Sequence, residues 1–394
     1  MKSSAEDSRR QASSILMISA EASSGLYAER LLQELKTRQP HVHCFGVGTP
    51  EMEALGFERL GRSEEMAVVG IVEILAHYKD LRKVFYNLVE QAKQRRPALV
   101  VLMDYPEFNL MFAKEMKKLG IPCVYYISPQ VWAWRQGRVH KIKKYCDQVL
   151  LLFPFEVEFY KQFDVPFQFV GHPLLDELPK DYQDRKKSLL HRRQCGFSDQ
   201  DIVIGLMPGS RRSELKYNFP TQLEVARQLL LKFPENVKIA VLVAPSFQKE
   251  QIQDYLQDLR FPIMVLKDDP FRMLDLVDYI LAASGTATLM VGLMEKPMVI
   301  MYKAQALTVF IGRRIIKGYF GIVNLILGKQ AVPERLQEQA NVTELTNLMA
   351  KYIQDPEYTQ KVREDLAQLQ NLLGTRGATS RVVNIIESYL PARS

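Results

Sequence analysis

One aspartate in the first half of the sequence is placed for proton transfer. Asp104 directly follows the apolar run Ala98–Met103 and opens the segment DYPEFN, residues 104–109. The run predicts a buried strand, and a carboxylate at the carboxyl end of a parallel strand lies in the crevice where such sheets bind ligands. There the carboxylate can take a proton from an attacking hydroxyl group. The alternative is that Asp104 only caps the helix that follows.

A glycine and an arginine in the second half are suited to bind phosphate. Gly209, Ser210 and Arg211 connect a predicted strand to a predicted helix. Glycine lets the backbone approach a ligand, a helix amino terminus favours an anion, and arginine makes bidentate contacts with phosphate oxygens. We therefore predict that this turn holds a pyrophosphate group. The alternative is a solvated basic turn.

A second turn of this kind consists of Ser284, Gly285 and Thr286, which again stand between a predicted strand and a predicted helix. Its backbone amides and hydroxyl groups are able to complete the phosphate site. Neither turn has the spacing of a Walker motif, so the pair favours a nucleotide diphosphate bound without a P-loop. A helix cap without a ligand is the alternative for this turn.

Three more loops of the first half carry candidate residues. Glu21, in the run of small residues SAEASSG, is able to accept hydrogen bonds from sugar hydroxyls, or is a solvated residue of an ordinary turn. Trp132 and Trp134 suit a sugar or an acyl chain, or pack over the top of the sheet. His172 ends the first predicted domain and is more simply a structural residue than a site residue.

The elements that position these residues follow one pattern. Short apolar runs alternate with amphipathic helical stretches along most of the chain, which is typical of parallel sheets made of βαβ units. We predict an α/β fold with two doubly wound, Rossmann-like domains that face a ligand cleft. The predicted boundaries are a flexible tail at 1–14, a first domain at 15–173, a linker at 174–200 and a second domain at 201–303. A helical segment at 304–394 is predicted to pack back across the cleft or onto a partner subunit.

Composition excludes several classes of protein. The 394 residues are 47% hydrophobic and 25% charged, so the chain is globular and neither disordered nor collagenous. Its net charge of +7 attracts anions such as phosphates or acidic lipids, but is too small to predict a nucleic-acid partner. The four cysteines have neither metal-ligand spacing nor the pattern of a disulfide framework. We therefore expect no metal site and a reducing, cytoplasmic setting.

Two stretches predict contact with a lipid surface, although no apolar run is long enough to span a membrane. Met66–Leu75 is almost uniformly apolar. Phe310–Phe320 places Arg313, Arg314 and Lys317 among large apolar side chains, as in an interfacial basic helix. Buried helix packing is the alternative for these stretches.

Together these segments resemble the lipid-A-disaccharide synthase family, whose members are inverting glycosyltransferases with the two-domain GT-B fold. The resemblance covers the chain from about Ile15 to about Gln337, and the motifs occur in the family's order. The segment SPQVWAWR at 128–135 is the most specific match, to the family's SPSVWAWR. The segments AEASSG at 20–25, DYPEFN at 104–109, FVGHP, PGSR and SGTATL also match.

The resemblance implies transfer of 2,3-diacylglucosamine from UDP-2,3-diacylglucosamine to 2,3-diacylglucosamine 1-phosphate. The products are a β-1,6-linked tetraacyl disaccharide phosphate and UDP, and the family uses neither a metal nor a cofactor. The resemblance implies Asp104 as the general base. It also implies a homodimer with exchanged C-terminal segments, and a cytoplasmic position at the inner-membrane surface. The implied binding residues are Glu21, Ser128, Trp132, Arg135, Gly209, Ser210, Arg211, Ser284, Gly285, Thr286, Asn324 and Gln337.

The sequence departs from the family at one position with a direct chemical consequence. Met290 stands where the family has a glutamate, which in many GT-B enzymes binds the ribose hydroxyls. A thioether is a very weak acceptor, so we expect ribose binding to be weaker or to depend on another residue. Two alternatives therefore stay open: a divergent GT-B enzyme that uses another UDP-sugar, and a homologue that binds lipid or nucleotide without catalysis.

Overall fold

The computed structural model describes residues 14–20, 22–66, 71–129, 131, 135–303 and 319–391, and for residues 22, 23 and 71–78 it describes the backbone alone. The described chain forms two compact units. The first unit comprises the residues up to 176 together with those from 373 on, and the second unit comprises residues 177–372. The chain therefore passes between the units twice.

The sheet of the first unit is parallel, with the strand order β3-β2-β1-β4-β5-β6-β7. Its central strands are buried on both faces, which explains their uninterrupted apolar sequences. The strands are β1 (Ser14–Ser19), β2 (His43–Gly48), β3 (Glu58–Arg62), β4 (Leu99–Met103), β5 (Cys123–Tyr126), β6 (Gln148–Leu151) and β7 (Phe167–Phe169).

Helices follow most of these strands and pack on the sheet. The described helices of this unit are α2 (Ala22–Arg38), α3 (Pro50–Ala54), α4 (Ser63–Met66), α5 (Ile71–Arg95), α6 (Pro106–Leu119), α7 (Arg138–Tyr145), α8 (Pro154–Gln162) and α19 (Ala378–Glu387). The short helix α9 (Leu174–Glu177) lies where the chain passes to the second unit.

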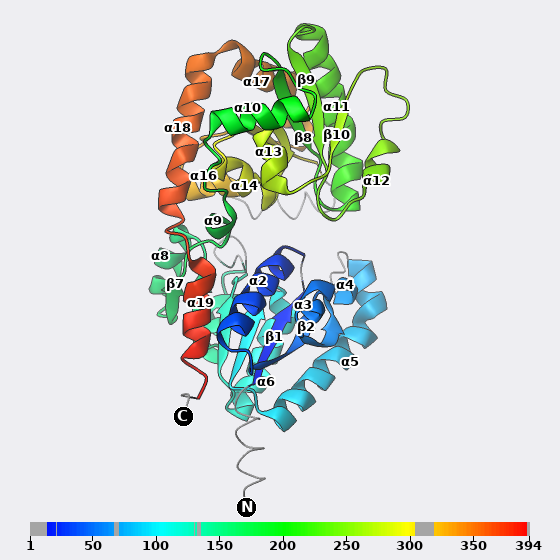
Figure 1. Ribbon diagram of the computed structural model, residues 1–394. Helices are drawn as coiled ribbons and strands as arrows, with labels where there is room; N and C mark the ends of the chain where they lie inside the picture. Colours follow the sequence, from blue (N-terminus) through cyan, green and yellow to red (C-terminus); the bar gives the residue numbers. More distant parts are fainter. Residues whose placement is uncertain are drawn as a thin grey trace, which may run out of the picture. The chain divides into compact units, whose positions relative to one another are not determined.

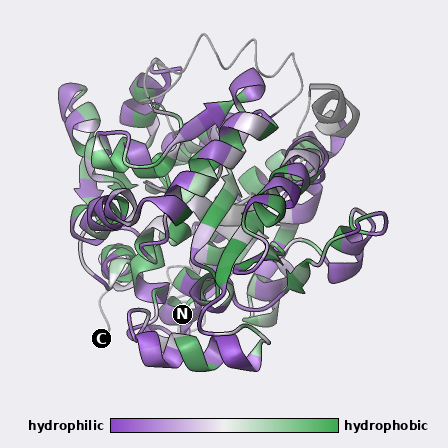
Figure 2. Cartoon of the chain, turned by 90° about the horizontal axis from the view of Figure 1, so that it is seen from above, coloured by the Kyte–Doolittle hydropathy of each residue, from purple (hydrophilic) through white to green (hydrophobic). Residues whose placement is uncertain are grey.

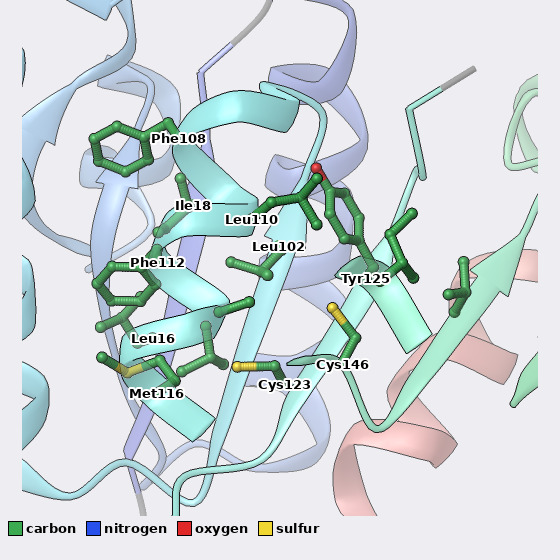
Figure 3. Packing of buried hydrophobic residues seen from close by; sticks show 14 of the residues in the cluster. Leu16, Ile18, Leu102, Phe108, Leu110, Phe112, Met116, Cys123, Tyr125 and Cys146 are labelled. Carbon is green, nitrogen blue, oxygen red and sulfur yellow. The ribbon is translucent and has the colours of Figure 1, made fainter. Parts of the chain in front are cut away.

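The core of the first unit holds the two elements on either side of Asp104. Leu16 of β1, Leu102 of β4 and Phe112 of α6 are buried in one cluster (Figure 3). Phe85 of α5 packs edge-on against the rings of Phe108 and Phe112, with centroid distances of 5.4 and 6.0 Å. Burial of each such side chain contributes about 1.5–3 kcal/mol. This packing fixes the end of β4 relative to the start of α6.

The sheet of the second unit is also parallel, with the strand order β10-β9-β8-β11-β12-β13. Its strands are β8 (Ile202–Met207), β9 (Val237–Leu242), β10 (Met264–Leu266), β11 (Tyr279–Ala283), β12 (Met298–Tyr302) and β13 (Glu334–Leu336). Its described helices are α10 (Arg185–Gln194), α11 (Arg212–Lys232), α12 (Lys249–Gln253), α13 (Pro270–Asp275), α14 (Ala287–Leu293), α16 (Ile322–Leu327), α17 (Val342–Gln354), α18 (Pro356–Leu372) and the 3₁₀-helix η1 (Gln337–Gln339).

The hydropathy of the residues differs between the sheets and the helices that cover them. The strands are mainly hydrophobic, whereas the helices alternate between hydrophobic and hydrophilic residues along their length (Figure 2). Amphipathic helices that cover buried parallel strands are the arrangement of doubly wound α/β folds. The predicted fold class, with two such sheets, is confirmed.

The C-terminal part holds one strand that the sequence did not indicate. The predicted helical segment is present, but it contains β13, which adds a parallel edge strand beside β12. After residue 372 the chain returns to the first unit, where α19 packs along α2 (Figure 1). Arg38 of α2 donates to Asn384 at 2.5 Å, and Asp176 accepts from the backbone amide of Thr379 at 3.2 Å.

The two stretches predicted to contact lipid are only partly described. Met66 ends α4, residues 67–70 lie outside the described residues, and Ile71 opens α5. Residues 304–318 also lie outside them, including Arg313, Arg314 and Lys317. None of the helices in the described part of the chain has both the length and the apolar composition needed to cross a membrane.

Candidate functional site

Asp104 lies directly after β4, in a turn that neighbouring groups hold in place. Its backbone amide donates to the carbonyl of Ile127 at 3.1 Å. Its backbone carbonyl accepts from the Tyr125 hydroxyl at 2.6 Å and from the Asn109 side-chain amide at 2.7 Å. The N-cap of α6 is Tyr105, so Asp104 does not occupy the capping position of the alternative interpretation.

The backbone of this turn is strained. Asp104 and Tyr105 have φ angles of +49° and +42°. Non-glycine residues held in sparsely populated regions cost about 1–3 kcal/mol each and persist only where the surroundings impose them. Aspartate tolerates the left-handed region better than tyrosine does. Such strain clusters at functional sites, and here it sets the direction of the Cα–Cβ bond of the half-buried Asp104.

Two arginines converge on one carboxylate beside this turn. Oε1 of Glu107, in the first turn of α6, accepts from Nη1 of Arg135 at 2.6 Å and also from Nη2 of Arg138. The Arg138 side chain is 9% exposed, whereas those of Arg135 and Glu107 are 54% and 59% exposed. The hydrogen bond from Arg138, with that arginine's charge and Arg135, holds the pKa of Glu107 below its usual value. The carboxyl group is therefore ionised, and the three side chains carry a net positive charge.

Ser128 is tied to a buried tyrosine. Its hydroxyl shares a hydrogen bond with the hydroxyl of Tyr160, and it lies 3.2 Å from the carbonyl of Pro129. Burial raises the pKa of Tyr160 above its usual range, so the phenol stays protonated. Trp132 and Trp134 lie outside the described residues, and their contact with a sugar or an acyl chain stays a prediction.

Glu21 also lies outside the described residues, but the turn beside it is fixed by small side chains. The hydroxyls of Ser19 and Ser24 are buried and 3.0 Å apart. A Cβ atom on Gly25 would lie 2.8 Å from Cγ2 of Thr49. The small residues at the start of α2 therefore have a packing reason within the first unit.

His172 is a structural residue. Its side chain is buried, Nδ1 accepts from the backbone amide of Leu174 at 3.2 Å, and its ring lies edge-on to Tyr27. Burial lowers the pKa of His172 to about 3, so the imidazole is neutral near pH 7. The structure agrees with the simpler of the two interpretations of this histidine.

The turn Gly209–Arg211 joins β8 to α11, and a carboxylate of the chain itself occupies it. Oε2 of Glu214 accepts from the backbone amides of Ser210 and Arg211 at 2.8 and 3.3 Å. Gly209 has a φ of +117°, and a Cβ atom there would lie 2.5 Å from Glu214. The helix amino terminus therefore does hold an anion, but that anion is Glu214.

Arg211 is the exposed group of this turn. Its side chain is 56% exposed, and Nη1 lies 3.7 Å from Oε1 of Glu214. Ser246, in the loop after β9, donates to the carbonyl of Ser210 at 2.7 Å and so supports the turn from the other side. The guanidinium of Arg211, and not the two amides bound to Glu214, is the group that a phosphate can reach.

The turn Ser284–Thr286 follows β11, which neighbours β8. Gly285 and Thr286 are exposed, and a Cβ atom on Gly285 would have no other atom within 4 Å. The φ of Gly285 does not require glycine either. The close approach of a ligand would explain a glycine that the fold itself does not need. Met290 lies one turn along α14 and is half-buried.

Lys303 follows β12 at the same edge of this sheet. Its backbone amide donates to Oδ1 of Asn218 at 2.8 Å, and its Nζ donates to Thr221 at 2.8 Å. Asn218 in turn donates to the backbone carbonyl of Glu214 at 2.8 Å. Burial lowers the pKa of Lys303. These bonds link α11 to the end of β12 and place a second cation at the edge that carries Arg211.

Asn324 and Gln337, the two candidate residues nearest the C-terminus, lie in different surroundings. Asn324, in α16, is buried; its amide donates to the carbonyl of Val332 at 2.8 Å and to Glu334 at 2.6 Å. Its side-chain carbonyl accepts from the amide of Val332 at 3.0 Å. These bonds tie α16 to β13, and a role of Asn324 toward a substrate stays a prediction. Gln337 directly follows β13 with a φ of +51°.

Within each unit, most of the described candidates follow the carboxyl ends of strands, where doubly wound sheets bind ligands. Asn324 does not, because it bonds to Val332 and Glu334 at the start of β13. In the first unit, Asp104, Ser128 and Arg135 follow the neighbouring strands β4 and β5. In the second unit, the two turns and Gln337 follow β8, β11 and β13. The described residues contain no group of three or more histidine, cysteine, aspartate or glutamate side chains suited to hold a metal ion.

Three side chains at the carboxyl edges of the two sheets were not predicted from the sequence: Glu214, Arg138 and Lys303. Glu214 had a signal, because a glutamate three residues after an N-cap is the pattern of a capping box. The sequence signal for Arg138 was weaker and consisted of its spacing of three residues from Arg135. Lys303 had none beyond its place after an apolar run.

Comparison with known proteins identifies the family. A family model described as Lipid-A-disaccharide synthetase matches residues 15–386. The lipid-A-disaccharide synthase of Geobacter metallireducens is 38% identical over 377 residues, which cover 95% of this chain and 97% of that protein. The enzyme of the same name from Geobacter sulfurreducens shows the same identity and coverage.

Solved structures of other proteins share the fold. MurG from Acinetobacter baumannii has a TM-score of 0.60 at 17% identity, over 95% of this chain and 99% of that chain. A glycosyltransferase of kitacinnamycin has a TM-score of 0.63 at 13% identity, over 96% and 99% of the two chains. The fold is GT-B, and the chain belongs to the lipid-A-disaccharide synthase family.

Proposed function

We propose that this glycosyltransferase joins UDP-2,3-diacylglucosamine to 2,3-diacylglucosamine 1-phosphate, giving the β-1,6-linked tetraacyl disaccharide 1-phosphate and UDP. The observation that carries the proposal is the family match over residues 15–386, which includes both the Asp104 turn and the Arg211 turn. A UDP-sugar donor is also supported by a structural neighbour, the UDP-GlcNAc 2-epimerase of Neisseria meningitidis, solved with UDP-GlcNAc at a TM-score of 0.61 and 12% identity.

Asp104 is the general base of the proposed reaction. Its carboxylate accepts the proton of the acceptor's 6-hydroxyl while that oxygen attacks the anomeric carbon of the donor. The bond from this carbon to the UDP oxygen breaks, and its electron pair leaves with UDP. Attack from the face opposite UDP inverts the configuration at the anomeric carbon. The strained turn serves this step because it holds the carboxylate in one direction before the substrate binds.

The donor diphosphate is bound by the second unit. Arg211 makes charge-assisted hydrogen bonds to phosphate oxygens, and Lys303 adds positive charge at the same sheet edge. Gly285 leaves room for the backbone to approach the donor. The positive side chains offset the negative charge that grows on UDP as it departs. We propose on this basis, and on the family resemblance, that neither a metal nor a cofactor takes part, so a chelator should leave the rate unchanged.

The reaction requires substrates with acyl chains, so the chain is proposed to work on the cytoplasmic face of the inner membrane as a peripheral protein. It is also proposed to act as a homodimer. Short segments that dock on their own unit, as α19 docks on α2, can make the same contacts with a second copy. Light scattering at several concentrations tests the dimer.

The test of the proposed function is an assay with both acylated substrates. Purified chain should form the tetraacyl disaccharide phosphate, identified by mass spectrometry, with one UDP released for each disaccharide. The Asp104→Asn variant serves as the control for contaminating activity. The absence of disaccharide from wild-type reactions would reject the proposal.

A further inference from the structure

The Glu107 cluster, formed by Glu107, Arg135 and Arg138, points to a second substrate group. Two guanidinium groups meet one carboxylate, so positive charge exceeds negative charge there. We propose that the Glu107 cluster binds the phosphate group of the acceptor sugar while Asp104 takes the proton from its attacking hydroxyl. This inference rests on the proposed function and assigns the phosphate of that reaction's acceptor.

Arg135 and Arg138 differ in their exposure. Arg138 is nearly buried, so it needs a charged partner, and Glu107 supplies one. Arg135 contacts the same oxygen from a position more than half exposed, where an ion pair contributes little stability. Its backbone nevertheless adopts a φ of +53°, which is unfavourable for a side-chain-bearing residue. The guanidinium of Arg135 is thus held at the exposed side of the cluster, where a substrate group can reach it.

The arrangement suits a phosphate monoester. Such a group carries about two negative charges near neutral pH and three strong acceptor oxygens. Arginine presents a planar fork of donors that matches two of these oxygens at once. Glu107 binds both arginines through Oε1 and so holds the two forks side by side. The backbone amide of Arg138 also donates to the carbonyl of Arg135 at 2.9 Å, which fixes the spacing of the two residues.

The distance from Asp104 suits one sugar. Glu107 follows Asp104 by three residues, so their Cα atoms are at most roughly 11 Å apart. In the acceptor, the 6-hydroxyl and the 1-phosphate are attached on the two sides of the ring oxygen of a single pyranose. A sugar whose hydroxyl meets Asp104 can therefore place its phosphate at the Glu107 cluster. The cluster would then select a phosphorylated acceptor and orient it for attack.

The test compares two acceptors, diacylglucosamine 1-phosphate and the same sugar without phosphate. The quantity measured is the phosphate preference, the ratio of the two kcat/KM values. Arg135→Gln should lower this preference by about tenfold to a hundredfold, as expected for loss of hydrogen bonds to a charged group. Arg135→Lys should retain part of it, because the charge stays and the fork is lost.

Arg96→Gln is the matched control. Arg96 is also exposed in the first unit and also has a left-handed φ of +47°, but it lies before β4 and donates to the carbonyl of Leu119 at 2.7 Å. The phosphate preference of the Arg96→Gln variant should equal that of the wild-type protein. An equal loss with both acceptors in Arg135→Gln, or no loss with either, would overturn the assignment.

A binding measurement separates this inference from the proposed function. If wild-type protein transfers sugar to neither acceptor, the proposed function fails. Calorimetric titration with glucosamine 1-phosphate and with glucosamine then decides the anion site. Binding that needs both the phosphate and Arg135 supports the site, and binding that needs neither overturns it.

Discussion

Asp104 combines two properties that suit a general base, a constrained backbone and a half-buried position at the edge of a sheet. We expect Asp104→Asn to lower kcat by about 10²–10⁴, the usual contribution of a positioned base, with little change in KM. Asparagine tolerates left-handed φ as aspartate does, so the turn should keep its shape. Steady-state rates, with thermal unfolding as the folding control, test this. Near-normal turnover would remove Asp104 from the role.

Arg211 should account for much of the affinity for the donor diphosphate. Its guanidinium is exposed, whereas two amides of the same turn are bound to Glu214. Arg211→Ala should therefore weaken UDP binding by about 1.5–3 kcal/mol, the range for hydrogen bonds to charged groups. Arg212→Ala, the adjacent exposed arginine, removes the same charge and should have a much smaller effect. Calorimetric titration of UDP compares them, and equal affinities in both variants would move the phosphate site elsewhere.

Met290 offers a test of ribose recognition. It is half-buried on α14, one turn beyond Thr286, and a thioether accepts hydrogen bonds only weakly. A glutamate there can accept two charge-assisted hydrogen bonds from neighbouring hydroxyls. Met290→Glu should thus tighten UDP binding, measured by the same titration. Weaker binding, from a carboxylate left unpaired, would show that another residue holds the ribose.

At the residue scale, sequence reasoning located the strand-end groups but not their partners. Asp104 and Arg211 follow long apolar runs, and such runs mark strand ends reliably. Glu214 fills the Arg211 turn through a bond between a side chain and the backbone, which leaves no mark in hydropathy. Arg138 meets Glu107 across 31 residues of chain, a distance that only the fold determines.

At the scale of elements, the missed strands share one property. The sequence indicated neither β3, β7 nor β13, and all three lie at the edges of their sheets. An edge strand pairs on one side and need not be apolar on both faces, as the sequences ERLGR and ERL show. Central strands such as β4 are buried on both faces, and the apolar run Ala98–Met103 predicted β4.

The start of α8 carries a group that should make stability depend on pH. Glu156 is buried, and its carboxylate accepts from the backbone amides of Leu152 and Phe153 at 3.3 and 3.0 Å. Burial outweighs these bonds and raises the pKa of Glu156 to about 7, from 4.5 in the unfolded chain. The proton is thus bound more tightly in the folded state. Its contribution to stability is fully present below pH 4.5 and is lost as pH rises through 7.

Glu156→Gln removes this titration and keeps the shape of the side chain. Between pH 5 and 7.5, the wild-type free energy of unfolding should fall relative to that of the variant by up to about 3 kcal/mol. Denaturant unfolding at several pH values measures the difference. Parallel pH profiles in the two proteins would mean that the carboxyl group is already ionised at pH 5.

At the scale of the whole molecule, the sequence predicted two doubly wound sheets and a C-terminal helical segment that packs back, but not the helix against which that segment lies. Helix α19 is amphipathic, and such a pattern requires a partner surface without naming it. That partner is α2, more than 300 residues earlier, through bonds such as Arg38 to Asn384. The first unit is therefore completed only when the C-terminal residues are present.

Several exposed side chains of the first unit support the proposed membrane association. Beyond the apolar start of α5, the side chains of Lys79, Arg82 and Lys83 are exposed. Tyr86, on the same helix, and Met111 of the adjacent α6 are 57% and 56% exposed. The guanidinium of Arg82 lies 5.5 Å from the centre of the Tyr86 ring. Basic and large apolar side chains that are exposed together are typical of a surface that lies on anionic lipid.

We expect reversible binding to anionic vesicles that combines a charge-dependent and an apolar part. Each basic residue near such a surface contributes about 1 kcal/mol, and its field is screened over about 8 Å at physiological salt. Replacing Lys79, Arg82 and Lys83 by glutamine should therefore weaken sedimentation with vesicles at low salt and matter little at high salt. The control variant replaces the exposed basic residues Arg185–Lys187 of α10 by glutamine. Both variants lower the net charge from +7 to +4. Equal losses in both variants would show that net charge alone, and not this surface, drives binding.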